Sequence, residues 1–219
     1  MFNTIKYPFR TSIGILAVLL SITATILLIY RAAIHGSAWH VVSFSIYGVS
    51  LITVWTMSTL YHTLKVSKAI SRTLEQIDHA MIYFLIAGTY TPICLVVLRG
   101  GWGWSLFGVT WTLAIAGIVL KLVFRHPAKW LRILFFSFYI IMGWLIVIAW
   151  VPLIHIMPRA GLFWLVTGGV LYTVGAGIFN LRHIKIHPRF GPHDIWHIFV
   201  LAGSFCHFWM MFNYVVYLK

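Results

Sequence analysis

The sequence predicts an all-α membrane protein in which residues 1–219 form one bundle of seven transmembrane helices. Of the 219 residues, 61% are hydrophobic and only 9% are charged, whereas a soluble domain carries about a quarter charged residues. Seven apolar runs are long enough for a helix to cross a hydrocarbon core of about 30 Å, which takes about 20 residues. The connectors between these runs are too short to hold a soluble domain.

The spans follow one another along the chain, and charged residues, glycines and prolines interrupt them. Their predicted ranges are 12–30, 39–61, 77–98, 103–124, 133–156, 161–181 and 194–218. The breaks between them are Arg31–Ser37, Lys65–Arg72, Arg99–Gly103, Arg125–Lys129, Pro158–Gly161 and Arg182–Pro192.

Several spans carry features of their own. The apolar stretch of the first span, Ile13–Tyr30, is longer than the 7–15 residues of a signal peptide's apolar region, so we expect a mature span. In the third span, Pro92 at the end of Gly88-Thr-Tyr-Thr-Pro92 predicts a bend. This bend either packs against a neighbouring helix or opens a cavity for an acyl chain.

The sixth span contains Gly168-Gly169 and Gly175-x-Gly177, which favour close helix packing. Cys94 and Cys206 both fall inside spans and are expected to be buried without a disulfide.

The basic residues predict the orientation of the bundle. The chain has 16 Lys and Arg against 3 Asp and Glu, a formal net charge of +13. Seven spans place most of the basic residues on the side of the N-terminus and few on the other. The first set is Lys6, Arg10, Lys65, Lys68, Arg72, Lys121, Arg125, Lys129, Arg132, Arg182, Lys185 and Arg189, and the second is Arg31, Arg99, Arg159 and Lys219. The positive-inside rule then predicts a cytoplasmic N-terminus and an external C-terminus in the inner (plasma) membrane. Topology and attraction to anionic headgroups account for the positive charge, so no nucleic-acid partner is expected.

Polar residues cluster at the ends of three spans. Ser58 and His62 are four residues apart at the end of the second span and share a helix face, as do His193 and His197 at the start of the seventh. Asp78 opens the third span. Alternating topology brings these three ends to the cytoplasmic boundary.

Three neutral imidazoles with one open position suit a catalytic Zn²⁺ whose fourth ligand is water. Zinc lowers the pKa of that water to about 7. Asp78 could accept the water's proton or orient a ligating imidazole, and Ser58 could hydrogen-bond to the water or to Asp78.

Other polar residues rank lower. Asp194 occupies the general-base position of a His-Asp-x-x-His sequence that resembles the zincin pattern His-Glu-x-x-His. We place it behind Asp78, because aspartate is one methylene shorter and no third ligand of zincin type follows. Glu75 is expected to be solvated in a basic connector. His207 is expected to make a polar contact inside the bundle, or to serve a substrate or a proton path.

These blocks, Ser58-x-x-x-His62, Asp78 followed by the Gly88–Pro92 stretch, and His193-x-x-x-His197, resemble the signature of the hemolysin III family. That family is the bacterial branch of the progestin and adipoQ receptors. The resemblance implies a seven-helix bundle with a cytoplasmic N-terminus and a zinc ion on the three histidines. It also implies that Asp78 contacts the zinc water and that Ser58 lies beside it. Because the wider superfamily includes alkaline ceramidases, it implies hydrolysis of an amide or ester bond in a membrane lipid or fatty-acid derivative.

The leading hypothesis is therefore a zinc-dependent intramembrane hydrolase. One alternative is a non-catalytic sensor or regulator of membrane lipid state with structural zinc. A second is a hemolysin-like cytolytic protein, although no row of charges lines any span as a conduction path would. A third is a haem b protein, because His193 and His207 are fourteen residues apart. A retinal protein is disfavoured, since the last span has no lysine before Lys219 to form a Schiff base.

Overall fold

The computed structural model describes residues 6–124, 128–180 and 191–218, apart from the side chains of residues 129 and 132. Within these ranges every regular element is helical, and seven helices are long and apolar enough to cross a membrane, as predicted. The helices are α1 (Pro8–His35), α2 (Ala38–Thr63), α3 (Lys68–Pro92), α4 (Gly101–Val123), α5 (Lys129–Trp144), α6 (Trp150–Ile156), α7 (Arg159–Asn180) and α8 (Pro192–Asn213). A π-helix (Ile93–Val97) follows α3, a 3₁₀-helix (Leu145–Ala149) joins α5 to α6, and a 3₁₀-helix (Val215–Tyr217) follows α8.

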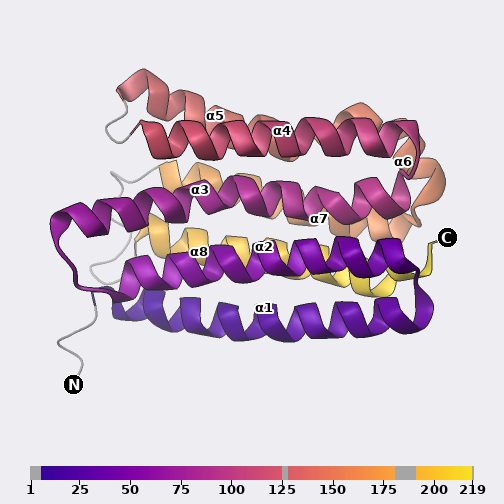
Figure 1. The fold of residues 1–219 in the computed structure, drawn as a ribbon, viewed down its shortest axis with the longest axis horizontal. Coiled ribbons are helices and arrows are strands. Elements are labelled where there is room, and N and C mark those ends of the chain that lie inside the picture. The colour runs from indigo at the N-terminus through magenta and orange to yellow at the C-terminus, as the bar shows by residue number, and fades with distance from the viewer. Residues whose placement is uncertain (1–5, 125–127, 181–190, 219) are drawn as a thin grey trace.

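The helices run alternately up and down, so the two termini lie at opposite ends of the bundle (Figure 1). The first helix α1 packs against α2 and α8, α7 packs against α8, and α3 packs between α2 and α4. The span that contains α3 is the most buried: 78% of its most apolar window is inside the protein, against 17–50% for the other six. The third span is therefore the centre of the bundle.

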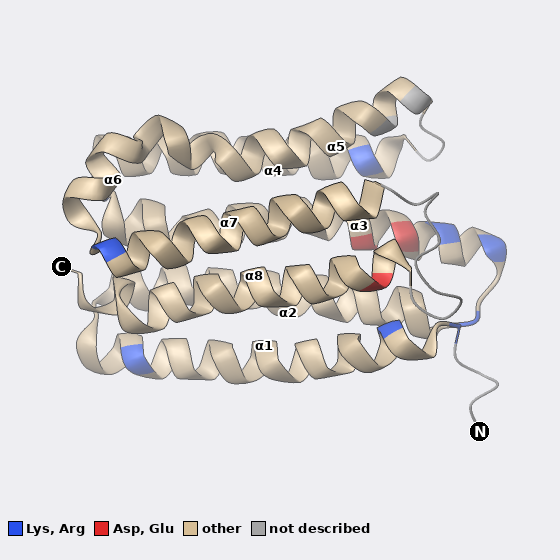
Figure 2. Ribbon diagram, turned by 180° about the vertical axis from the view of Figure 1, so that it is seen from behind, with Lys and Arg blue, Asp and Glu red and all other residues tan. Residues whose placement is uncertain are grey.

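The charged residues gather at the ends of the bundle (Figure 2). All three acidic residues lie at the end that holds the N-terminus, which we call the N-terminal end. Most of the described lysines and arginines lie there too, and Arg31, Arg99 and Arg159 lie at the opposite end. The predicted orientation also used five basic residues outside the described ranges: Arg125, Arg182, Lys185, Arg189 and Lys219. The membrane orientation remains a prediction.

The helix that contains the third span begins nine residues before the predicted start of that span. The helix begins at Lys68, where the Ser67 side chain accepts a hydrogen bond from the Ile70 backbone N–H at 3.4 Å. The extra turns are polar, so a search for apolar runs could not find them. The predicted placing of Glu75 in a connector was also wrong, because it is a half-buried residue of α3.

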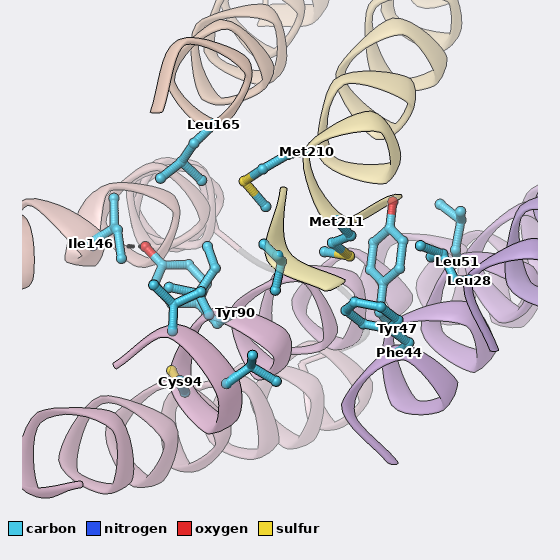
Figure 3. Close-up of a cluster of buried hydrophobic side chains, with 14 of the residues drawn as sticks. Leu28, Phe44, Tyr47, Leu51, Tyr90, Cys94, Ile146, Leu165, Met210 and Met211 are labelled. Atoms are coloured by element: carbon cyan, nitrogen blue, oxygen red, sulfur yellow. Dashed lines mark hydrogen bonds between the residues drawn. The ribbon is translucent and has the colours of Figure 1, made fainter. Parts of the chain in front are cut away.

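The fifth span, predicted to be continuous, is interrupted by Tyr90 of α3. The Tyr90 hydroxyl donates to the Gly143 carbonyl at 2.9 Å and accepts from the Ile146 backbone N–H at 2.9 Å (Figure 3). A side chain that enters the backbone hydrogen-bond ladder breaks a helix at that point. The chain accordingly narrows to a 3₁₀-helix at Leu145–Ala149 before α6 begins.

The core beside α1 is apolar. Leu28, Phe44, Tyr47, Met210 and Met211 are all fully buried (Figure 3). The two cysteines are buried and free, as expected, since Cys94 and Cys206 form no disulfide. Side-chain packing, and not a bond between these cysteines, therefore stabilises the core.

Close packing in the sixth span involves half of its paired glycines. Gly168 and Gly175 of α7 lie against side chains of α8, whereas Gly169 and Gly177 have open space around them. The expectation of close packing is thus confirmed for the buried glycine of each pair.

Candidate metal centre

Three histidines meet at the N-terminal end of the bundle. His62 lies in the last turn of α2, and His193 and His197 lie in the first two turns of α8. Their ring centroids are 4.9 Å (His62–His193), 5.1 Å (His62–His197) and 5.0 Å (His193–His197) apart. One nitrogen from each ring lies within 4.8 Å of the other two. The predicted coincidence of three imidazoles is present.

The start of α8 holds two of these rings in place. Pro192 occupies the first helical turn, as its fixed φ angle predicts. The Asp194 Oδ2 accepts the Gly191 backbone N–H at 2.8 Å, and its Oδ1 accepts the Arg10 Nε–H at 2.8 Å. A carboxylate at a helix N-terminus is also favoured by the helix dipole. Because both Asp194 oxygens have protein partners, this residue is placed to anchor α8 rather than to act as a base.

The imidazole nitrogens fit a metal ion. His62 has no exposed surface, and neither of its nitrogens has a hydrogen-bond partner among the described residues. His197 Nε2 also has no hydrogen-bond partner among the described residues. Buried side-chain nitrogens are nearly always paired, and neutral imidazoles are common metal ligands. These three closely spaced histidines, of which His62 and His197 are buried and His193 is half-buried, could therefore bind a metal ion.

Ser58 and Asp78 form a second polar group near the histidines. Ser58 lies one turn before His62 in α2, and its side chain lies close to the Asp78 carboxyl of α3. Both residues are buried. A further contact places His79 Nδ1 3.8 Å from Asp78 Oδ2. Asp78 does not belong to the compact group of donor atoms formed by the three histidines. Its role at a metal centre remains a prediction.

Two neighbours of the centre were missed by the reading of the sequence. The Tyr7 ring lies edge-on to the His62 ring with centroids 5.7 Å apart, and the Tyr7 backbone N–H donates to the His62 carbonyl at 3.1 Å. The Arg10 guanidinium lies 4.7 Å from the centroid of the Tyr7 ring. The start of the first helix therefore contacts both helices that carry the histidines. An aromatic and a basic residue before the first span were the available signal, but nothing local connects them to the histidines.

An apolar cavity lies deeper in the bundle, between α3, α5, α7 and α8. The cavity has a volume of about 150 Å³ and is partly open to the outside. Val54, Ile82 and Val200 line it about one helical turn from the residues of the candidate centre. Tyr90 and Ile93, on either side of Pro92, also line it. Residues beside Pro92 therefore line an apolar cavity, and the opening of that cavity by a proline bend remains a prediction.

Comparison with known proteins gives consistent relatives. A family model described as Haemolysin-III related matches residues 2–208. Hemolysin-3 of Bacillus cereus is 43% identical over 199 residues, which cover 90% of this chain and 86% of that protein. The Hemolysin-3 homolog of Bacillus subtilis (strain 168) is 44% identical over 201 residues, covering 92% and 90%. The monocyte to macrophage differentiation factor of Homo sapiens is 25% identical over 186 residues, covering 83% and 74%.

Proposed function

Because the chain belongs to the haemolysin-III-related family, we propose that this multi-pass membrane protein is a zinc-dependent hydrolase of an amide or ester bond in a membrane lipid. The observation that carries the proposal is the group of three closely spaced imidazoles beside Ser58 and Asp78, in which the buried His62 and His197 rings have nitrogens without a partner among the described residues. We place the reaction at the cytoplasmic face of the inner (plasma) membrane, where the predicted orientation puts the N-terminal end of the bundle.

The three histidines would hold the ion. His62 comes from α2, and His193 and His197 come from the anchored first turns of α8. Bound zinc supplies a Lewis acid for the carbonyl group and lowers the pKa of coordinated water to about 7. Zinc with three histidines keeps one coordination position free, which hydrolysis requires.

Asp78 and Ser58 would manage the proton. One Asp78 carboxylate oxygen accepts the proton of the attacking water and then delivers it to the leaving nitrogen or oxygen of the lipid. The Ser58 hydroxyl, which lies close to this carboxyl, would fix its orientation through a hydrogen bond. The two residues come from different helices, so a hydrogen bond between them would also tie α2 to α3 at the site.

The apolar cavity would hold the acyl chain of the substrate. Its walls come from the helices that carry the candidate site and from α5 and α7. Ligand cavities are lined mainly by apolar side chains with a few polar groups that orient the ligand. A chain seated there would place its carbonyl group toward the polar end of the bundle.

Metal analysis and lipid turnover on one set of purified variants test the proposal. We expect about one zinc per chain in the parent, and loss of both metal and hydrolysis in His62→Ala and His193→Ala. The control is His155→Ala, at an exposed histidine of α6. Asp78→Asn should keep the metal and lose activity by about 10²- to 10⁴-fold.

Two outcomes would reject the hydrolase. Full hydrolysis by metal-free protein would exclude a zinc mechanism. Zinc that raises the thermal stability while no lipid product accumulates would support the sensor alternative, since a metal held by α2 and α8 ties two helices together.

A further inference from the structure

One buried histidine outside the metal centre lines the apolar cavity. His207 of α8 is 4% exposed and forms part of the cavity wall. Its Nδ1 has no hydrogen-bond partner among the residues that the structure describes. A buried nitrogen without a partner is unfavourable unless a ligand or water completes it.

Most of the other polar side chains along the cavity differ from His207. Six of them have partners within the protein, through bonds of 2.8–3.0 Å to backbone carbonyls or hydroxyls. These side chains are Thr89, Tyr90, Tyr139, Trp144, Tyr172 and Thr173. The hydroxyl or indole N–H of each of these six side chains is paired, whereas His207 Nδ1 has no partner among the described residues.

The His207 ring is held by its neighbours. It stacks on the Tyr172 ring, with centroids 5.4 Å apart and an interplanar angle of 26°. The Tyr172 hydroxyl pairs with Ser204 Oγ at 2.9 Å, which fixes the ring on which His207 stacks. On the neighbouring helix α7, a Cβ atom at Gly168 would lie 2.7 Å from His207 Nε2, so only glycine at this position leaves room for the imidazole. The ring is therefore fixed in advance of any ligand.

We propose that His207 binds an oxygen atom carried partway along the acyl chain, so that the protein selects hydroxylated or oxo-substituted fatty acyl chains. A neutral imidazole has one donor and one acceptor nitrogen, so it can pair with a hydroxyl or with a carbonyl group. His207 lies ten residues beyond His197 in the same helix, a distance of about 15 Å or roughly a dozen carbon–carbon bonds. This inference rests on the proposed function for one point, that the head of the acyl chain lies at the metal centre.

Equilibrium binding of fatty acids to the purified protein in detergent tests the proposal without any turnover. The probes are octadecanoic acid, 12-hydroxyoctadecanoic acid and 3-hydroxyoctadecanoic acid, and the readout is tryptophan fluorescence. We expect the 12-hydroxy acid to bind roughly tenfold more tightly than the 3-hydroxy isomer, the value of one hydrogen bond. His207→Leu should abolish this difference, whereas His155→Leu, at an exposed histidine, should keep it.

Partitioning of the acids into detergent is the same for all variants, so the ratio between parent and variant reports the site. Equal binding of the two hydroxy isomers by the parent would overturn the proposal, even if His207→Leu failed to fold. A preference that persists in a folded His207→Leu would overturn it as well. Selective binding without hydrolysis would reject the hydrolase and keep this inference, and hydrolysis without selectivity would do the reverse.

Discussion

Replacing Arg10 with methionine should loosen the start of α8 and weaken the candidate metal centre. The Arg10–Asp194 pair has an Nε–Oδ1 distance of 2.8 Å, and the two side chains are 19% and 8% exposed. Methionine keeps much of the length of the arginine side chain and removes its charge. The Asp194 carboxylate then stays mostly buried with the Gly191 N–H as its described partner.

The size of the effect follows from this burial. A hydrogen bond to a charged group contributes about 1.5–3 kcal/mol, and a fully buried charge left alone costs about 3–5 kcal/mol. Because Arg10 is partly exposed, water can reach the pair, so we expect a loss of about 2 kcal/mol in the free energy of unfolding. Zinc affinity should fall about tenfold, since Asp194 anchors the turn that carries His193 and His197.

Unfolding by a denaturing detergent, followed by tryptophan fluorescence, measures the first effect, and zinc competition with a chelator measures the second. The control is Arg159→Met, an exposed arginine at the opposite end of the bundle. A double-mutant cycle with Asp194→Asn should give a coupling of about 1–2 kcal/mol. Coupling below about 0.5 kcal/mol together with unchanged zinc affinity would refute the reasoning.

Three further changes test other parts of the structure. Gly88→Ala places a methyl group against the Ser50 side chain, so the free energy of unfolding should fall by about 1–3 kcal/mol. The control is Gly108→Ala, where nothing lies within 4 Å of the added methyl group. Its free energy of unfolding should not fall in the same titration. Tyr90→Phe removes the hydroxyl that pairs with the Gly143 carbonyl and with the buried Ile146 N–H, and should cost about 1–3 kcal/mol in that assay. Tyr30→Phe, at a 63% exposed position, should cost little. Zinc restored to chelated protein at a thousand times its Kd should stabilise the bundle by about 4 kcal/mol; an unchanged melting temperature would contradict metal binding to the folded state.

Much of the candidate centre could be predicted because its geometry is local or follows from topology. The spacing of His193 and His197 places both on one helix face whatever the rest of the chain does. The number of spans places His62 at the same end of the bundle as this pair, since alternating helices return every second end to the same side. These inferences use periodicity and counting, which the sequence contains directly.

The contacts that could not be predicted depend on which helices are neighbours. Arg10 and Asp194 are 184 residues apart, and they meet because α1 packs against α8. The Tyr90 hydroxyl of α3 interrupts the fifth span, and no residue of the fifth span itself predicts the interruption. The polar start of α3 was missed for a different reason, since hydropathy detects only the part of a helix that lies in lipid.

The origin of the three histidines in α2 and α8 has a consequence for biosynthesis. His62 enters the membrane with the second span, whereas His193 and His197 enter only with the seventh. A nascent chain that lacks its last helix therefore carries a single member of the ligand set. Zinc retention would then distinguish a completed polypeptide from a truncated one, because only a chain translated through α8 contains all three histidines.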